Sequence, residues 1–320
     1  MKILFMIRDP FMNAYPKLIE EAKAIAEQVK VLCTDNGISK EELLKEVRDV
    51  AIIVVAIVKI DREVIDAAPQ LKYIIKFGAG YDNIDVEYAY QKGIPVTNAP
   101  GLNAESVADH AFGLMLAASR NIPQKDQEIK SHHWELSVGH EIYGKQLGIV
   151  GFGSIGKAIA KRAVGFDMEI LAFGHYKDLD AAQKWNVTFV EKEELFAACD
   201  YIIICTSLTD QNRKMVNKGL LDLMKPTAFI INISRGGLIN EEDLIQALKQ
   251  QKIKGAALDV FALEPPKNEL TLLPNVVATS HIGGSTYESI ERIGILTIQN
   301  IKRFLVNEAL EYVVTPITKK

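Results

Sequence analysis

Residues 147–163 read LGIVGFGSIGKAIAKRA and place three glycines, Gly151, Gly153 and Gly156, in the spacing G-x-G-x-x-G. In a strand–turn–helix unit with this spacing, the first glycine permits the tight turn and the second lets the backbone approach a pyrophosphate. The third glycine allows the helix to pack closely on the strand. The stretch therefore predicts a loop that binds the phosphates of a dinucleotide.

The sequence on both sides of the glycines supports this prediction. An apolar run at 146–151 precedes them, and an amphipathic helical pattern at 155–163 follows them. We expect the backbone N–H groups of Ser154 and Ile155, together with the helix dipole, to attract the phosphates. The alternative is a glycine-rich turn without a ligand, which the flanking strand and helix disfavour.

Short apolar runs alternate with helical patterns through most of the chain. Several runs are apolar at nearly every position, as expected of parallel strands that are covered by helices on both faces. The runs that predict strands are 2–7, 31–32, 51–58, 71–77, 95–97, 146–151, 168–173, 201–205, 227–233, 254–260 and 275–279. The helical patterns are 16–29, 39–47, 103–120, 155–163, 191–198, 241–250 and 287–306. Repeated strand–helix–strand units predict a doubly wound α/β architecture.

The distribution of these elements predicts two parallel-sheet domains. Five short strands precede residue 100 and at least five follow residue 145, and a length of 320 residues is typical of about two domains. The tail at 311–316 has strand character, so we expect it to return to the first sheet. The first domain would then be discontinuous, with residues 1–102 and 288–320, and the second would span 103–287.

Composition excludes several classes of protein. With 48% hydrophobic and 24% charged residues, the chain can bury large cores, unlike disordered or fibrous proteins. Its 37 basic and 41 acidic residues leave a net charge of −4, without the basic surplus of a nucleic-acid-binding protein. The longest apolar run, 51–58, is far below the ~18 residues of a membrane helix, and residues 1–8 lack the features of a signal peptide. We therefore expect a cytoplasmic globular protein without a membrane or nucleic-acid partner.

The cysteines and the paired histidines do not form a metal-binding pattern. Cys33, Cys199 and Cys205 are an odd number without a CxxC pair, and the last two flank or lie in an apolar segment, which favours buried thiols. His132 and His133 have no acidic partner at metal-ligand spacing, and there is no HExxH motif. The sequence predicts no metal.

The residues that follow the second predicted strand of the dinucleotide domain bear on cofactor choice. An acidic residue about 20 positions after the glycine motif normally accepts hydrogen bonds from the adenine ribose. This sequence has Gly174 there, then His175, Tyr176 and Lys177, and no carboxylate before Asp178. Because a carboxylate would repel the 2′-phosphate of NADP, its absence predicts use of NADP or of both NADP and NAD.

Three further motifs each place a chemically active residue after a predicted strand. ISRGG contains Arg235, LDVFALEPP contains Glu264 and TSHIGGST contains His281. In an open parallel sheet, ligands collect at the carboxyl ends of the strands. A guanidinium binds carboxylate or carbonyl oxygens, an imidazole exchanges a proton near neutrality, and a carboxylate beside the imidazole favours its charged form. A salt bridge, a loop carboxylate and a core histidine are the alternatives for each residue alone, but the three together favour an active site.

The order of GFGSIG, ISRGG, LDVFALEPP and SHIGG resembles the D-isomer-specific 2-hydroxyacid dehydrogenase family, which includes 3-phosphoglycerate, glyoxylate/hydroxypyruvate and D-lactate dehydrogenases. FGAGYDNID at 77–85 is similar to the substrate-binding loop of that family, and NAPGLNAESVADH at 98–110 to the start of its interdomain helix. The resemblance implies a flavodoxin-like substrate domain over 1–102 and 288–320 and a Rossmann NAD(P)-binding domain over 103–287.

The resemblance also implies roles for individual residues. Arg235 would bind substrate, Glu264 would pair with His281, and His281 would act as general acid and base. The backbone around Gly78, Ala79 and Gly80 would hold the substrate carboxylate. The remaining cofactor-binding residues would be Thr206, Ser207, Ile233, Asp259 and Gly283, with Asp259 contacting the nicotinamide amide.

These residues predict an oxidoreductase that transfers a hydride between NAD(P)H and C2 of a small 2-oxo acid or D-2-hydroxy acid. The substrate would be of the glyoxylate, hydroxypyruvate or phosphoglycerate type. The alternative is a non-catalytic dinucleotide-sensing protein similar to the transcriptional corepressors of the family, which resemble this sequence at the same three residues. The chain continues only briefly beyond its last predicted helix, which favours the enzyme over a protein with an interaction tail.

Two features outside these motifs carry further expectations. Residues 101–140 join a long apolar helix to an arm with Trp134, which is more than a hinge requires, and predict a homodimer. We expect His110, on this helix, to be structural or near the interdomain cleft. Lys76 precedes the substrate-binding loop and could meet a substrate phosphate, although a lysine at a strand end is more often a solvated charge.

Overall fold

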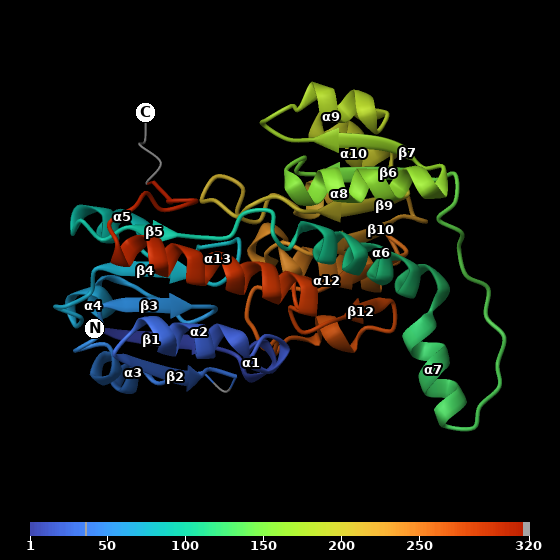
Figure 1. Ribbon diagram of the computed structural model, residues 1–320. Helices are drawn as coiled ribbons and strands as arrows, with labels where there is room; N and C mark the ends of the chain where they lie inside the picture. The colour runs from blue at the N-terminus through green and yellow to red at the C-terminus, as the bar shows by residue number, and fades with distance from the viewer. Residues whose placement is uncertain (36, 316–320) are drawn as a thin grey trace. The chain divides into compact units, whose positions relative to one another are not determined.

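The computed structural model describes residues 1–35 and 37–315. The chain divides into two compact units (Figure 1). The N-terminal unit comprises Met1–Asn103 together with the chain from Ser285 onward, and the central unit comprises Ala104–Gly284.

The N-terminal unit contains a five-stranded parallel sheet in the order β2-β1-β3-β4-β5, which is the flavodoxin-like order. Its strands are β1 (Lys2–Ile7), β2 (Gln28–Cys33), β3 (Ile52–Val55), β4 (Tyr73–Lys76) and β5 (Val96–Thr97). Its helices are α1 (Asp9–Ala14), α2 (Lys17–Ile25), α3 (Lys40–Glu46), α4 (Arg62–Asp66), α5 (Val86–Gln91) and α13 (Tyr287–Leu305).

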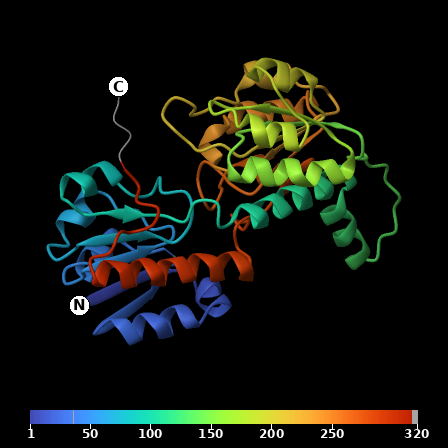
Figure 2. The same cartoon turned by 45° about the horizontal axis from the view of Figure 1, so that its top comes forward.

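Strand β3 shows why these runs are apolar at every position. Successive side chains of a strand point to opposite faces of the sheet. Ile52 and Val54 pack in one core cluster, to which α13 contributes, while Ile53 and Val55 pack in another on the opposite face. Figure 2 shows α13 lying along this sheet. Both faces are covered, so alternation with polar residues is absent.

The central unit contains a seven-stranded parallel sheet in the order β12-β11-β10-β9-β6-β7-β8. Its strands are β6 (Gln146–Val150), β7 (Glu169–Phe173), β8 (Val187–Phe189), β9 (Tyr201–Ile204), β10 (Phe229–Asn232), β11 (Gly255–Leu258) and β12 (Val276–Ala278). Its helices are α6 (Ala104–Arg120), α7 (Ile122–Lys130), α8 (Ser154–Ala163), α9 (Leu179–Lys184), α10 (Lys192–Ala198), α11 (Lys218–Leu221) and α12 (Glu241–Lys249), with short 3-10 helices at Val164–Phe166, Gly236–Leu238 and Glu269–Leu272. The order reverses between β6 and β9, so the crevice at their carboxyl ends is the expected ligand site of a Rossmann sheet.

Several elements differ from the sequence expectations. The helix expected over 16–29 ends at Ile25, because Ala26 is extended and Gln28 already pairs with Lys2 as the first residue of β2. Strand β8 and the short helices α1, α4, α5, α9 and α11 were not expected, and neither was α7. Short elements and a polar helix such as α7 lack the apolar periodicity on which the expectation rested.

The C-terminal tail returns to the sheet of the N-terminal unit, as expected from its strand character. Val313 forms an antiparallel bridge with Thr97, and the N–H of Val314 donates to the carbonyl of Val96. Pro316, the last residue of the expected strand, lies outside the described residues. Within the described parts of the chain, no helix combines the length and apolar character needed to cross a bilayer.

Candidate active site

The glycine loop joins β6 to α8, and its backbone is close enough to its neighbours to require glycine. Gly151 has φ of +105°, and a Cβ there would lie 2.8 Å from the nitrogen of Thr206. A Cβ at Gly156 would lie 2.2 Å from the oxygen of Gly151. Gly153 precedes the first turn of α8, which carries no acidic residue. An exposed set of N–H groups at a helix N-terminus without a competing carboxylate fits the phosphates of a dinucleotide.

The other residues expected to bind the cofactor lie at the same edge of the sheet. Thr206 and Ser207 follow β9, Ile233 follows β10, Asp259 follows β11, and Gly283 lies in the loop after β12. The hydroxyl of Ser234 donates to the carbonyl of Thr206, which ties the loop after β10 to the loop after β9. The carboxyl ends of these parallel strands therefore bring the expected cofactor residues to one side of the sheet.

The segment after β7 lacks an available carboxylate. Gly174 has room for a side chain, because a Cβ there would make only ordinary contacts, the nearest at 3.5 Å. His175, Tyr176 and Lys177 are exposed. Asp178 caps α9, with one oxygen accepting from the N–H of Ala181 at 3.0 Å and the other from Lys157 Nζ at 2.9 Å. The first acid after the strand is thus already engaged.

Asn232, which the sequence analysis does not single out, holds the backbone of Arg235. Asn232 is buried at the end of β10. Its amide Nδ2 donates to the carbonyl of Arg235 at 3.0 Å, and its Oδ1 accepts from the N–H of Ser234 at 3.1 Å. The signal in the sequence was an amide side chain inside an otherwise apolar strand, where a buried polar group needs a specific partner.

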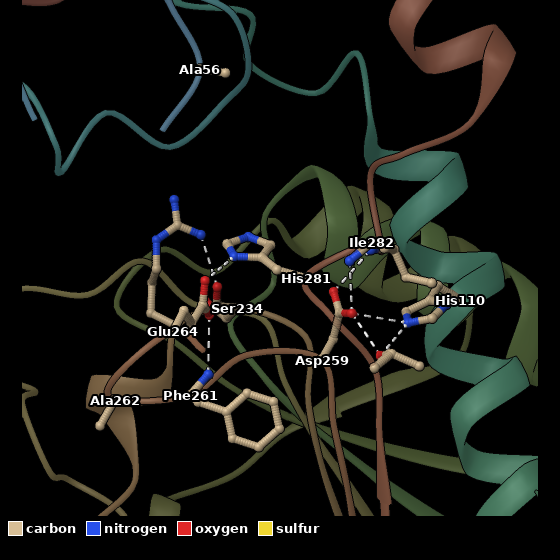
Figure 3. A network of polar contacts seen from close by, with 12 residues as sticks. Ala56, His110, Ser234, Asp259, Phe261, Ala262, Glu264, His281 and Ile282 are labelled. Carbon is tan, nitrogen blue, oxygen red and sulfur yellow. Dashed lines mark hydrogen bonds and ion pairs between the residues drawn. The ribbon is translucent and has the colours of Figure 1, made fainter. Parts of the chain in front are cut away.

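Glu264 and His281 form a direct pair (Figure 3). His281 Nδ1 lies 2.8 Å from Glu264 Oε2, while Glu264 Oε1 accepts from the N–H of Phe261 at 3.1 Å. Partial burial acts to raise the pKa of Glu264, but the hydrogen bond and charge of His281, the Phe261 N–H and the charge of Arg235 outweigh it and lower that pKa. An ionised carboxylate on Nδ1 orients the imidazole and directs Nε2 away from the pair, where it can exchange a proton.

The loop after β4 in the N-terminal unit contains Gly78, Ala79 and Gly80. Its shape is set by two contacts from the end of β5: Asn98 Nδ2 donates to the carbonyl of Ala79 at 2.6 Å, and the N–H of Ala99 donates to the carbonyl of Gly78 at 2.9 Å. Asn98 was not expected from the sequence, because its role depends on β4 and β5 being neighbours.

Lys76 corrects an expectation. The residue type and its place at a strand end predict a solvated charge, but Lys76 is buried. Its ammonium group donates to the carbonyl of Ala56 and, at 3.0 Å, to Asn83 Oδ1. A strand that is covered on both faces leaves no exposed side at its last residue, so the side chain is kept inside and hydrogen-bonded.

Cys199 is buried and Cys205 is partly buried, whereas Cys33 belongs to an exposed group with Asp9 and Asp35 whose ligand atoms lie close enough together to hold a metal ion. Burial raises the pKa of the Cys199 and Cys205 thiols to about 12, so both stay protonated. The carboxylate of Asp35 already accepts hydrogen bonds from Cys33 Sγ, from the N–H of Asp9 and from the guanidinium of Arg8.

Comparison with known proteins decides the family. The sequence profile described as "D-isomer specific 2-hydroxyacid dehydrogenase, NAD binding domain" matches residues 112–283. The chain belongs to the D-isomer-specific 2-hydroxyacid dehydrogenase family. It is 43% identical over 302 residues to D-3-phosphoglycerate dehydrogenase of Methanocaldococcus jannaschii, covering 93% of this chain but only 58% of that relative. It is 41% identical over 288 residues to glyoxylate reductase of Pyrococcus furiosus, covering 87% of this chain and 86% of the relative.

Solved structures agree with the family. An acyclic imino acid reductase in complex with NADPH and D-Arg is similar with a TM-score of 0.88 and 28% identity, over 98% of this chain and 100% of that one. D-lactate dehydrogenase from Aquifex aeolicus, complexed with NAD and lactic acid, has a TM-score of 0.84 and 26% identity, over 96% of each chain. These matches agree with a Rossmann domain combined with a second α/β domain, and the match to a NAD-binding-domain family supports a nicotinamide cofactor.

Proposed function

We propose that this dehydrogenase reduces a small 2-oxo acid to the corresponding D-2-hydroxy acid, and catalyses the reverse reaction, with His281 as general acid and base. The observation that carries the proposal is the His281–Glu264 pair, with Arg235 near enough to lower the pKa of Glu264, at the sheet edge that also holds the glycine loop. The relatives named as glyoxylate reductase and phosphoglycerate dehydrogenase support a small acid of this type as substrate.

Each residue has a distinct part in the proposed reaction. When bound, a reduced nicotinamide supplies the hydride that adds to C2. His281 donates the proton from Nε2 to the oxygen on C2, while Glu264 holds the imidazole through Nδ1 and stabilises its charged form. Arg235 binds the carboxylate and polarises the oxygen on C2, which a planar guanidinium can do through two hydrogen bonds.

We assign the two units different parts in this reaction. The central unit would bind the dinucleotide through the loop around Gly151 and Gly156, since both positions exclude side chains. The N-terminal unit would act as the substrate domain, with the loop around Gly78, Ala79 and Gly80 holding the carboxylate through its backbone. The domain boundaries expected from sequence, 1–102 with 288–320 and 103–287, are part of this proposal.

The cofactor is proposed to be NADPH, or NADPH and NADH alike. Gly174 presents no carboxylate to the adenine ribose, and Asp178 is occupied by Lys157 and the cap of α9. The exposed residues His175 and Lys177 offer positive charge to a 2′-phosphate. Similar structures in complex with NADPH and with NAD support a nicotinamide cofactor and are compatible with either choice.

We also propose that the enzyme is a cytoplasmic homodimer formed through its arm, defined as residues 122–140. Trp134, Leu136 and Val138 are 82%, 94% and 97% exposed, an unusual concentration of apolar surface. Figures 1 and 2 both show α7 and the extended segment after it projecting from the rest of the central unit. A second copy of the chain is the occupant that we propose for this surface. The three cysteines are free thiols, which suits a reducing compartment.

The test is oxidation of NADH and NADPH with glyoxylate, hydroxypyruvate and pyruvate. We expect turnover with at least one of the three. His281→Ala should lower kcat by about 10²–10⁴-fold, as is typical for loss of a general acid. Arg235→Ala should raise KM and lower kcat together, because Arg235 would contact substrate in both the ground state and the transition state. Absence of turnover with every pair, while the nucleotide still binds, would favour a dinucleotide-sensing protein instead.

A further inference from the structure

His281 has a backbone conformation that rarely occurs for residues other than glycine. Its φ is +56°, in the left-handed region. This conformation costs roughly 1 kcal/mol for a residue with a Cβ and persists only where the surrounding structure imposes it. The conformation also decides where the imidazole points, because the side chain leaves from this Cα. The contacts that impose it are therefore part of the proposed acid–base machinery.

One residue, Asp259, accepts hydrogen bonds from three consecutive backbone N–H groups of this loop. The N–H of His281 donates to the backbone carbonyl of Asp259 at 2.8 Å. The N–H of Ile282 donates to Asp259 Oδ1 at 2.9 Å, and the N–H of Gly283 donates to Asp259 Oδ2 at 2.8 Å. A Cβ at Gly283 would lie 3.0 Å from the same carboxylate, so the loop follows the carboxylate closely. The left-handed turn at His281 is thus held by a single residue, through its backbone carbonyl and its carboxylate.

Asp259 is itself fixed by two side chains from other elements (Figure 3). It is buried, and burial would raise its pKa, but hydrogen bonds from His110, Thr279, Ile282 and Gly283 lower that pKa. Thr279 Oγ1 donates to Asp259 Oδ1 at 2.7 Å. His110 Nε2, from helix α6, lies 3.0 Å from Thr279 Oγ1 and 3.3 Å from Asp259 Oδ1. Since the threonine hydroxyl donates to the carboxylate, His110 Nε2 must carry the proton and donate.

We infer that His110 is a positioning residue for the proposed reaction: through Thr279 and Asp259 it holds His281 in its left-handed conformation. The expected effect of His110 on catalysis rests on the proposed function. Its expected effect on the loop that contains His281 rests on the geometry alone. His110 contacts neither Glu264 nor His281 in this network, so it acts through the carboxylate. A histidine that only filled space on α6 would not affect the N–H groups of Ile282 and Gly283.

The experiment compares three variants of the full-length protein. His110→Leu removes the donor and keeps an apolar side chain. His110→Gln keeps a donor at a similar reach. Asp109→Asn is the matched control, because Asp109 is the adjacent residue on α6 and pairs with Arg162 on the surface at 2.7 Å. For each variant, kcat and KM for the 2-oxo acid, the Kd of NADPH, and the hydrogen exchange of Ile282 and Gly283 are measured.

His110→Leu should lower kcat by about tenfold or more, since small misplacement of a catalytic group has effects of this order. The Kd of NADPH should stay close to that of the wild type, and the Ile282 and Gly283 amides should exchange faster. His110→Gln should restore most of kcat and of the exchange protection, and Asp109→Asn should change neither. A wild-type kcat, or unchanged exchange at both amides, in His110→Leu would overturn the inference.

Two further measurements cover the cases in which a variant does not fold or the wild type shows no activity. Thr279→Val removes the hydroxyl with little change in shape and should act in the same direction, so it replaces His110→Leu if that variant does not fold. Thr279→Val with unchanged exchange at Ile282 and Gly283 would also overturn the inference. If the wild type reduces no 2-oxo acid, the proposed function fails, and the exchange measurements alone still decide whether His110 holds the loop.

Discussion

Glu264 holds the imidazole of His281 with one carboxylate oxygen and the N–H of Phe261 with the other. Its pKa lies below the usual value of 4.5, chiefly because the pairing with His281 outweighs the effect of partial burial. A carboxyl whose pKa is lowered by folding stabilises the folded state at every pH above its unfolded-state pKa. This stabilisation is lost as the pH falls through the lower, folded-state pKa. The Glu264 carboxylate is therefore ionised throughout the neutral range, with its negative charge beside His281 Nδ1.

The Glu264→Gln variant tests the effect of this charge. In the reductive direction His281 must be protonated, and glutamine cannot stabilise the positive charge. We expect the pH at which reduction declines to move to lower pH, while the Kd of the nicotinamide cofactor stays the same. The measurement is kcat/KM for a 2-oxo acid from pH 5 to 9. A pH profile that matches that of the wild type would remove Glu264 from the proposed role.

Asp259→Asn tests the buried carboxylate through stability. One of the N–H groups of Ile282 and Gly283 would face an amide donor, so we expect the free energy of unfolding to fall by about 1–3 kcal/mol at pH 7. The pKa of Asp259 is lowered from 3.8 in the folded state. The difference in free energy of unfolding between the wild type and the variant should therefore be constant above about pH 5, and it should shrink as the pH falls through the folded-state pKa. Both tryptophans, Trp134 and Trp185, lie in the central unit, so their fluorescence during urea unfolding reports on it. An advantage that grows as the pH falls towards 3 would contradict this assignment of charge.

At the scale of secondary structure elements, the segment between the end of β7 and the start of α9 is where the proposed cofactor choice is tested. Gly174→Asp places a carboxylate at a position with room for it and without a positive φ. We expect kcat/KM to shift from NADPH towards NADH, because the carboxylate repels the 2′-phosphate and accepts from the ribose hydroxyls. Gly165→Asp is the matched control: it adds the same charge in open space beyond the far end of α8 and should leave the ratio unchanged.

The wild-type ratio is a second check on the same element. A preference of the wild type for NADH by a hundredfold or more, about 2.7 kcal/mol in transition-state terms, would contradict our interpretation of Gly174. Equal use of both cofactors would agree with it, because the missing carboxylate removes discrimination without requiring a positive contact from Lys177.

At the scale of the whole molecule, the arm predicts the oligomeric state. Leu136→Ser combined with Val138→Ser should convert the proposed dimer into a monomer, because the variant lacks two almost fully exposed apolar side chains whose burial would drive association. Light scattering at micromolar concentration measures the change in mass. Leu272→Ser is the matched control, since Leu272 is 82% exposed but lies outside the arm, and it should remain dimeric. A monomeric wild type would refute the proposal.

The two-sheet α/β architecture, the glycine loop and the three site residues could be predicted from the sequence, because each depends on local spacing. Apolar runs without alternation predict doubly covered parallel strands, and glycines at 151, 153 and 156 have the spacing of a dinucleotide-binding turn. Residues that follow parallel strands lie at one edge of the sheet, because the carboxyl ends of all these strands are at that edge. No knowledge of which strands are neighbours is needed for any of these inferences.

Only the tertiary structure decided the contacts between distant segments. His110 and Thr279 are 169 residues apart and meet because α6 packs beside β12, so the support of His281 has no sequence signature. Lys76 is buried although its residue type favours solvent, because helices cover both faces of its strand. Asn98 reaches Ala79 because β5 pairs with β4. Spacing along the chain determines which chemical groups reach the edge of a sheet, whereas packing between elements determines what holds those groups in place.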